Sequence, residues 1–451
     1  MNKESSFFDV IEGDKEQSFL EEAVVQSDEF VPSQEYKVEH TYNTMKYEHE
    51  NVEYPRTLLA CDIPPQLKMV KNSKRENSLC LLKPVDKDCP EIEKHYIRML
   101  RGSIWEEKEK ESYELVNVCH TPFKIVVTQT ESMYKLLENN GITDLVDYYQ
   151  DHIDGPLIRV YYDNGTWNVS TSSLIYADGH WQNKRSFLEL FQETLEAIGG
   201  DMEKDLDKEL SYYFIMCNPD YLQIIEIYKH GLFFKEARNK SFELVTDVNL
   251  PDHYMRLNTY SDWVIDETNT VIHPHTLYSI VLTNGDTIRV SNWMYEELQI
   301  IKGNESHVNN MIINVLREPH YKIELFAYNF SKHLEILNKT NYYIQVYCDM
   351  LFKKYLKKET VILPMEHPLQ KNLYHHVKKM YGIQNNARES KTHILDIIHK
   401  NDNIPRQGHL DFRWRENYVR DYIMGCSNVD ISILVNMTKK FLEEREKRKE
   451  K

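Results

Sequence analysis

Glycine, proline and long apolar runs are all scarce in this sequence. The chain has 14 glycines and 15 prolines among 451 residues. Collagen-like and low-complexity proteins need far larger proportions of these residues, so both architectures are excluded. No apolar run approaches the length that spans a bilayer, and the first residues lack the apolar core of a signal peptide. We therefore expect a soluble protein that makes no contact with a membrane.

Paired metal ligands are also missing from the sequence. The seven cysteines are dispersed, and no two of them have CxxC spacing. The sequence therefore predicts neither a zinc site nor a disulfide framework, and it is typical of the reducing cytosol. Two histidine pairs, His273 with His275 and His375 with His376, have no second ligand pair at a matching spacing. We expect no metal at these histidines.

Positive charge is in deficit. The chain has 55 Lys and Arg residues against 71 Asp and Glu residues, which gives a formal net charge of −16. The surface as a whole cannot attract nucleic acid, so RNA binding would need a local basic face. Residues 1–53 are strongly acidic and have no sustained periodicity. This segment is predicted to be a disordered arm, or alternatively an arm that binds a partner or imitates the charge of nucleic acid.

Hydrophobic residues, by contrast, are plentiful enough to form several cores. They make up 41% of the chain, and 30 tyrosines contribute to an aromatic content of 12%. A chain of 451 residues is too long for one typical core, so we expect two or three units. We assign an acidic arm (1–53), a central domain (54–305) and a helical C-terminal domain (306–451).

The strongest local signal lies at residues 152–171. The dipeptide Asn164-Gly165 separates two runs rich in β-branched and aromatic residues. Such a dipeptide accepts the positive φ angles of a two-residue hairpin turn. The pattern predicts strands at 157–162 and 166–171. Gly155 precedes the first strand and would let a ligand approach the backbone closely.

The other elements are assigned from the period of the apolar residues. A second Asn-Gly dipeptide, at 284–285, predicts a hairpin with strands at 277–282 and 287–290. From about residue 309 onward the chain is predicted to be helical. Further strands are expected at 123–127, 211–217 and 222–228, and helices at 104–113, 144–149, 187–198 and 344–355.

The start of the first hairpin resembles a known motif. His152-Ile153-Asp154-Gly155 is similar to K-x-D-G, motif I of the covalent nucleotidyltransferases, which include DNA ligases, RNA ligases and mRNA capping enzymes. With the Asn-Gly-x-Trp and Ser-Thr that follow, the segment resembles the RNA-ligase-like proteins of large cytoplasmic DNA viruses, of the African swine fever virus type. The resemblance extends over about residues 120–400. It implies an α+β fold: a nucleotidyltransferase (ligase-like) domain with a twisted antiparallel sheet, followed by the helical domain.

The resemblance also implies an activity. RNA ligases of this kind join RNA 5′-phosphate and 3′-hydroxyl ends with ATP and Mg²⁺, and a lysine amine attacks the α-phosphate of ATP and holds AMP covalently. In this chain His152 stands at the position of that lysine. Three functions remain open. The first is a viral RNA ligase, and the second is a catalytically inactive ligase-like protein that binds nucleic acid or is packaged in the virion. The third is a structural or interaction module that acts through the acidic arm.

Four residues besides His152 are candidates for nucleotide binding. They are Asp154, Gly155, Arg159 and Arg289. A guanidinium matches the oxygen atoms of a phosphate, so the two arginines would contact phosphates, and Asp154 would meet a ribose hydroxyl or a metal. Each residue also has a structural alternative. His152 could be a packing residue, Asp154 could end the preceding loop, and the arginines could form ion pairs at a sheet edge.

The remaining motifs are incomplete. Tyr278-Ser279 stands where motif IV has a glutamate, and Arg289 is the one cation left from the K-x-K of motif V. The strand at 211–217, in the zone of motif III, offers no carboxylate. Lys124 and Lys302 are amines that could replace the missing nucleophile. Because both Asn-Gly hairpins carry these motifs, we expect them in one sheet, with both on its concave face.

Basic residues follow at the end of the amphipathic helix predicted at 344–355. The lysines between 353 and 379, which include Lys353, Lys354, Lys357 and Lys358, are interleaved with Tyr355, Tyr374 and Tyr381. Such lysines would bind RNA phosphates while the rings stack on bases. The alternative is a solvated helix face. RNA is the expected partner, and the acidic arm could bind a viral protein. The expected location is the viral factory in the host cytoplasm, or the virion.

Overall fold

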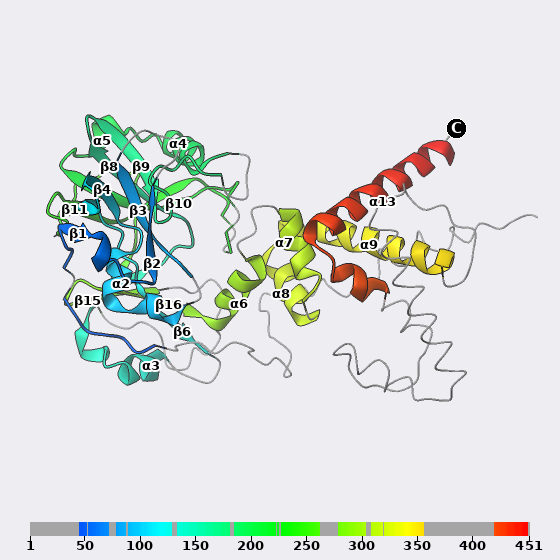
Figure 1. The fold of residues 1–451 in the computed structure, drawn as a ribbon, viewed down its shortest axis with the longest axis horizontal. Coiled ribbons are helices and arrows are strands. Elements are labelled where there is room, and N and C mark those ends of the chain that lie inside the picture. Colours follow the sequence, from blue (N-terminus) through cyan, green and yellow to red (C-terminus); the bar gives the residue numbers. More distant parts are fainter. Residues whose placement is uncertain are drawn as a thin grey trace, which may run out of the picture. The chain divides into compact units, whose positions relative to one another are not determined.

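The computed structural model describes residues 45–51, 53–71, 78–86, 89–128, 133–180, 185–221, 223–224, 227–261, 278–303, 308–318, 320–355 and 419–449. These residues belong to two compact units, which divide between Ile300 and Ile301 inside helix α6 (Trp293–Lys302). The described residues of the first unit form the sheets, and those of the second are mainly helical (Figure 1). The chain is therefore a mixed α+β protein with largely antiparallel sheets and C-terminal helices, as the sequence predicted.

The first sheet has the strand order β1–β5–β4–β3–β2, with antiparallel neighbours. Its strands are β1 (Thr57–Leu59), β2 (Leu67–Lys71), β3 (Leu79–Pro84), β4 (Ile104–Glu109) and β5 (Ser112–Asn117). Trp105 and Leu82 form its core together with Ile97 and Leu100 of helix α2 (His95–Leu100). This packing joins the short helix to the sheet.

The helix expected at 104–113 is wrong, because these residues form β4 and the start of β5. Glu111 turns the chain between the two strands with a φ of 64°. Along β5, Tyr113 and Leu115 are buried while Glu114 between them is exposed, which is the period of a strand. The many charged residues of β4 hide this period in the sequence.

The second sheet has the order β12–β11–β10–β8–β9, and β13 pairs with β11. Its strands are β8 (Leu157–Asp163), β9 (Thr166–Thr171), β10 (Leu210–Cys217), β11 (Gly231–Asn239), β12 (Leu244–Val245) and β13 (Met255–Arg256). The hairpin predicted around Asn164 and Gly165 is confirmed, since their φ angles are 50° and 80°. The strand predicted at 222–228 is wrong in its described residues. The next strand after β10 is β11, which begins at Gly231 and pairs with β10.

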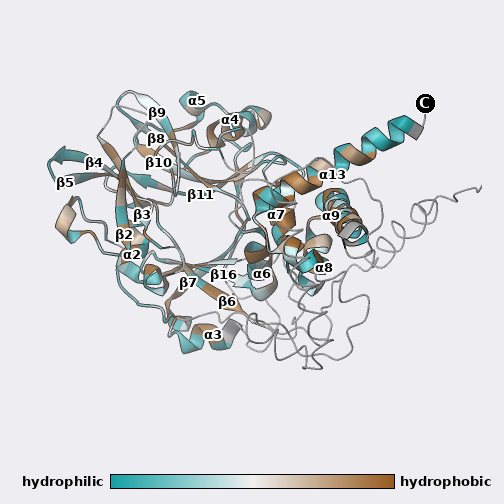
Figure 2. Cartoon of the chain, turned by 45° about the vertical axis from the view of Figure 1, so that its right-hand side comes forward, coloured by the Kyte–Doolittle hydropathy of each residue, from teal (hydrophilic) through white to brown (hydrophobic). Residues whose placement is uncertain are grey.

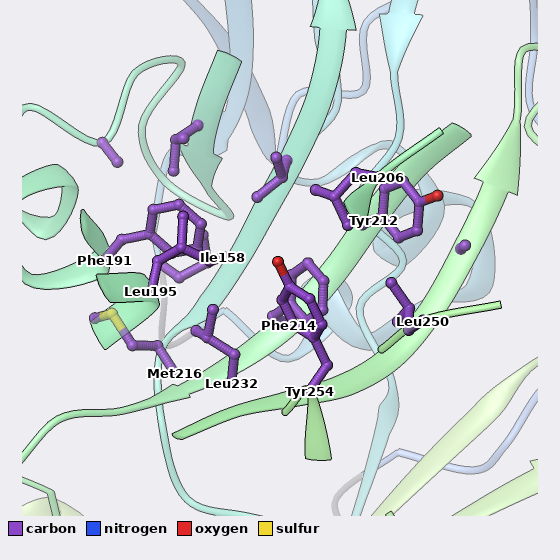
Figure 3. Close-up of a cluster of buried hydrophobic side chains, with 14 of the residues drawn as sticks. Ile158, Phe191, Leu195, Leu206, Tyr212, Phe214, Met216, Leu232, Leu250 and Tyr254 are labelled. Atoms are coloured by element: carbon purple, nitrogen blue, oxygen red, sulfur yellow. The ribbon is translucent and has the colours of Figure 1, made fainter. Parts of the chain in front are cut away.

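Helix α4 (Phe187–Ala197) packs against the second sheet, and the short helix α5 (Met202–Asp205) follows it. A capping box starts α4: Ser186 Oγ accepts from the Glu189 amide, and the Glu189 carboxylate accepts from the Ser186 amide. Phe191 of this helix packs with Ile158 of β8 and Phe214 of β10 in one buried cluster (Figure 3). Full burial of such a side chain contributes about 1.5–3 kcal/mol. This core therefore holds the start of β8, at Ile158, against α4 and β10.

The third sheet has the order β14–β7–β15–β16–β6, in which only the β16–β6 pair is parallel. Its strands are β6 (Phe123–Val127), β7 (Val146–Asp151), β14 (Thr259–Tyr260), β15 (Tyr278–Leu282) and β16 (Thr287–Asn292), and helix α3 (Met133–Asn139) packs on it. The helix expected at 144–149 is wrong, because most of that segment is β7. Its valine and tyrosines favour a strand, and β14 and β15 pair with it on either side.

The two Asn-Gly hairpins lie in different sheets of the first unit. The β8–β9 hairpin belongs to the second sheet, and the β15–β16 hairpin belongs to the third. The expectation of one shared sheet is therefore wrong. Residues 152–156 connect the two sheets, because they link β7 to β8.

The turn of the second hairpin holds the chain that precedes β1. The Tyr47 hydroxyl donates to Asp286 at 3.0 Å, Arg98 donates to the same carboxylate at 3.1 and 2.8 Å, and the imidazoles of His95 and His120 lie 3.4 and 2.9 Å from it. These groups hold the pKa of Asp286 well below its usual range although burial opposes them. The predicted disordered arm is therefore wrong for residues 45–51. Residues 1–44 lie outside the described part of the chain.

The described residues of the second unit form helices. These are the end of α6, α7 (Val308–Val315), α8 (His320–Asn329), α9 (Leu334–Tyr355) and α13 (Asn428–Lys449). Ile344, Cys348 and Leu351 of α9 are at most 2% exposed, which confirms the amphipathic helix predicted at 344–355. Figure 2 shows that α13 is hydrophilic toward its C-terminal end. Among the described helices, none is long and apolar enough to cross a membrane.

Candidate functional site

Residues 152–156 carry the chain from the third sheet to the second. Strand β7 ends at Asp151, and β8 begins at Leu157. Gly155 is required between them, because a Cβ atom there would lie 2.6 Å from the carbonyl oxygen of Met216 on β10. Packing against β10 thus accounts for this glycine without a ligand. The connection passes close to β10 because residue 155 has no side chain.

His152 is the first residue of this connection. Its Nδ1 lies 3.0 Å from Oγ of Ser279 on β15. Burial lowers the pKa of His152 well below its usual value, and the positive charges of Arg289 and Lys235 lower it further. The imidazole is therefore neutral at pH 7. A neutral imidazole presents one donor nitrogen and one acceptor nitrogen.

A row of polar side chains crosses the third sheet beside His152. Ser279 pairs with Arg289 between β15 and β16, and Arg289 pairs with Lys124 between β16 and β6. Side chains that are directly opposite in a sheet project from the same face. The side chains of Arg289 and Lys124 are 23% and 36% exposed. An anion can therefore reach both cations from solvent.

Glu296 on α6 accepts from both of these cations. Its carboxylate pairs with Nζ of Lys124 and with Nη2 of Arg289 at 3.3 Å, and it accepts from the Ser291 hydroxyl. Glu296 itself is only 3% exposed. Sequence reasoning missed this residue because a glutamate near the start of a helix is common. No spacing in the sequence links it to Lys124.

Asp154 is anchored inside the connection. Its Oδ1 accepts from the Tyr295 hydroxyl at 2.8 Å, and its Oδ2 accepts from the Ile224 amide at 2.7 Å. Burial, followed by the charge of Asp154, raises the pKa of Tyr295 well above its usual value, so the phenol stays protonated. Both carboxylate oxygens of Asp154 are therefore engaged by the protein. The crossover cluster, as we call this site, consists of Lys124, His152, Asp154, Ser279, Arg289, Ser291, Tyr295 and Glu296.

Arg159 lies outside the crossover cluster, in the interior of the first unit. It is 1% exposed and donates to Oγ of Ser170 at 2.8 Å and to the carbonyl oxygens of Gly102 and Val118 at 3.1 and 2.6 Å. A guanidinium held in this way cannot reach a phosphate unless these hydrogen bonds break. We therefore correct the sequence-based assignment of Arg159 to phosphate contact. The alternative of a sheet-edge ion pair fails too, because Arg159 donates to two carbonyl oxygens and a hydroxyl.

The lysines assigned to RNA binding are only partly covered by the structure. Lys353 lies on the last turn of α9. The side chain of Lys354 and the whole of Lys357 and Lys358 lie outside the described residues. Residues of α7, α9 and α13 line an open pocket of about 450 Å³. None of the predicted site residues lines this pocket. Lys302, the second candidate amine, ends α6.

The donor set of the crossover cluster suits phosphates better than a protein-held Mg²⁺. Among the described residues, no group of three or more His, Cys, Asp or Glu side chains could hold a metal. The oxygens of Asp154 and Glu296 are already engaged. Arg289 and Lys124 are paired with Glu296 as well, but their side chains are partly exposed, and they are donors of the kind that bind the phosphates of ATP. Mg²⁺ commonly enters such sites with the phosphates, and the protein supplies few of its ligands.

Comparisons with known proteins give little beyond this geometry. No family model matches the chain, and no curated protein matches it. Among solved structures, the chain is similar to a protein described as "Putative ATP-dependent DNA ligase from Aquifex aeolicus". The TM-score is 0.32 and the sequence identity is 11%, over 60% of this chain and 72% of that chain.

Proposed function

We propose that the chain is a ligase-like nucleotide-binding protein that holds the phosphates of ATP at the crossover cluster. One observation carries the proposal. His152 occupies the position that resembles motif I, and Ser279 and Arg289 occupy those that resemble motifs IV and V. His152 contacts Ser279, and Ser279 pairs with Arg289. The three positions thus meet at the point where the chain passes between two sheets, although more than 120 residues separate the first from the others.

The charges of the cluster are suited to phosphate. Arg289 and Lys124 lie side by side on the third sheet, and the positive charge of Lys235 on β11 acts on His152 from the second sheet. A guanidinium can donate two parallel hydrogen bonds to phosphate oxygens, and an ammonium adds a compact charge. The α-, β- and γ-phosphates of ATP would accept hydrogen bonds from these two kinds of donor. Bound ATP supplies an activated phosphoanhydride, and Mg²⁺ would arrive with it.

Covalent transfer through a lysine is not part of this proposal. The motif position carries an imidazole, and the nearby amine of Lys124 is paired with the Glu296 carboxylate. An amine attacks phosphorus through its nitrogen, and Nζ of Lys124 is directed at the Glu296 carboxylate. We therefore infer that ATP binds without forming a lysine-linked adduct. The RNA partner implied by the resemblance would then be bound but not joined.

A second candidate is an RNA ligase that uses His152 as its nucleophile. The observation that favours it is the neutral imidazole, one nitrogen of which lies against Ser279. The other nitrogen, Nε2, would form a bond to the α-phosphorus of ATP while pyrophosphate leaves. AMP would then pass to an RNA 5′-phosphate, and the RNA 3′-hydroxyl would displace it to complete the joint. The bond from Nε2 to phosphorus breaks when AMP passes to the RNA 5′-phosphate. AMP leaves when the 3′-hydroxyl attacks, and the proton of that hydroxyl passes to solvent.

The test of the leading proposal is equilibrium binding of ATP to the full chain. Replacing Arg289 by alanine removes the guanidinium at the centre of the polar row, so we expect the Kd for ATP to rise at least tenfold, or about 1.4 kcal/mol. Arg185→Ala is the matched control, because Arg185 is 32% exposed and pairs with Glu193 and Asp220. That variant should bind ATP as the native protein does. Equal ATP affinity in both variants, or no binding by the native chain, would overturn the proposal.

A further inference from the structure

Glu296 already occupies the donors that a phosphate would need. Its carboxylate is bound by the ammonium of Lys124, the guanidinium of Arg289 and the hydroxyl of Ser291. Three donors that converge on one group of oxygen atoms form the arrangement expected for an oxyanion site. Here the oxyanion is a side chain of the protein itself.

The start of α6 positions this carboxylate. The helix follows β16 directly, and Oδ1 of Asn292 accepts from the Tyr295 amide at 2.8 Å, which caps the first turn. Tyr295 is tied in turn to Asp154. Glu296, the next residue, is therefore directed back toward the Arg289 side of β16. Its location follows from the strand-to-helix junction.

The two sides of this contact differ in their access to solvent. The carboxylate side chain is 4% exposed, whereas the side chains of Arg289 and Lys124 are 23% and 36% exposed. A buried carboxylate is stable only while it is paired. The cations, however, remain within reach of a ligand that approaches from outside. A ligand can thus compete for them without entering the core.

We propose that Glu296 is a built-in competitor for phosphate, which lowers the affinity of the crossover cluster for ATP and makes it selective for multiply charged phosphates. The inference rests on the proposed ATP binding. A phosphate chain carries more charge and more acceptor oxygens than a carboxylate, so it can take Lys124 and Arg289 from Glu296. A ligand with a single carboxylate gains nothing by the same exchange. Ser291 can stay bonded to Glu296 while the cations turn to the ligand.

The experiment compares ATP binding by the full-length native chain, Glu296→Gln and Glu297→Gln. Glutamine keeps the shape and the acceptor oxygen for Ser291, but it loses the charge that holds the two cations. We expect Glu296→Gln to bind ATP at least tenfold more tightly. Glu297→Gln is the matched control, because Glu297 is the next residue of α6 and is 1% exposed. It loses the same charge and should leave the ATP affinity unchanged.

Two further probes test the selectivity. Inorganic pyrophosphate should gain affinity from Glu296→Gln as ATP does, because the gain comes from phosphate contacts. Acetate at the same concentration should not displace ATP from the native chain, but it should weaken ATP binding in Glu296→Gln, where the cations are released. Glu296→Asp provides a second variant should the glutamine variant fail to fold. It keeps the charge on a shorter side chain, and we expect an intermediate gain in ATP affinity.

The possible outcomes separate this inference from the proposal on which it rests. Tighter binding by Glu296→Gln than by the native chain, with an unchanged control, supports both. Measurable ATP binding by the native chain that is equal or weaker in Glu296→Gln and in Glu296→Asp would overturn the competitor and leave ATP binding intact. If neither the native chain nor a folded Glu296 variant binds ATP or pyrophosphate, both proposals fail.

Discussion

His152 and Ser279 are 127 residues apart in the sequence, and Nδ1 of the first lies 3.0 Å from Oγ of the second. The contact joins the connection between two sheets to strand β15, and it brings together two positions that resemble separate ligase motifs. Burial and the charges of Arg289 and Lys235 keep the imidazole neutral. A neutral histidine beside a serine supplies neither the positive charge nor the primary amine of a lysine, so we expect no lysine-type adduct at this position.

The protonation of His152 gives a first prediction. Unfolded, the imidazole titrates near pH 6.5, and in the folded chain its pKa is lower. Below about pH 6.5 the unfolded state therefore binds a proton that the folded state does not, so folding stability falls as the pH falls. The loss should be smaller in His152→Gln. Urea unfolding at pH 7.5 and pH 5.5 measures the difference, and an equal loss of stability in the two proteins would contradict a neutral His152 in the folded chain.

A second prediction concerns Asp286. This carboxylate is fully buried and accepts from Arg98 and Tyr47. Asp286→Asn would leave the buried Arg98 without its counter-charge, and we expect a loss of about 3–5 kcal/mol in the free energy of unfolding. The control is Asp220→Asn, because the Asp220 side chain is 63% exposed and pairs with Arg185 at the surface. It should cost about 1 kcal/mol or less. Urea titration measures both losses. Similarly small losses in the free energy of unfolding for the two variants would refute the buried network.

Arg159 and Arg289 should separate stability from binding. Arg159 is enclosed and bonded to protein acceptors, so Arg159→Ala should reduce the free energy of unfolding by about 3 kcal/mol, as expected when a buried hydrogen-bonding network is broken. Arg289→Ala should cost less than about 1.5 kcal/mol, because its side chain is 23% exposed. Urea midpoints should therefore fall more in Arg159→Ala than in Arg289→Ala. ATP titrations of the same two variants should show the larger loss of affinity in Arg289→Ala. A specific loss of ATP binding in a fully stable Arg159→Ala would reverse our assignment.

Gly155 provides a test of the connection itself. A Cβ atom at this position would lie 2.6 Å from the Met216 carbonyl oxygen and 2.8 Å from Nε2 of Gln223. Gly155→Ala should therefore destabilise the fold by about 1–3 kcal/mol through overpacking. Gly425→Ala is the control, since its Cβ would meet no atom closer than 3.4 Å. Thermal unfolding that showed no difference between the two variants would mean that the backbone of the connection shifts freely.

The sequence predicted those elements whose signals are local. Asn164 and Gly165 specify a turn by their own φ preferences, and Ser186 with Glu189 begins α4 through a capping box. The sequence failed where pairing decides the structure. Residues 146–151 form a strand because β14 and β15 lie on both sides of them, and nothing in the segment itself reveals those partners.

The candidate site was predicted in the same uneven way. The positions of His152, Ser279 and Arg289 followed from motif resemblance, and the structure brings them together. Glu296 could not be found, because its role comes from the direction in which α6 leaves β16. Arg159 was assigned wrongly. It lies on the same face of β8 as Leu157 and Tyr161, and that face packs against buried hydrophobic clusters instead of a ligand. The alternation along a strand predicts which residues share a face, but not what that face contacts.

The most direct test of the central claim uses ATP labelled on its α-phosphate. The full-length protein is incubated with the labelled ATP and Mg²⁺, and one sample is measured by equilibrium binding while another is denatured and separated by electrophoresis. We predict bound label in the first measurement and no labelled protein in the second. Labelled protein that disappears in His152→Ala would establish the histidine nucleophile. A label that survives this substitution would mean that Lys124 or another amine carries AMP, and either result would contradict non-covalent binding.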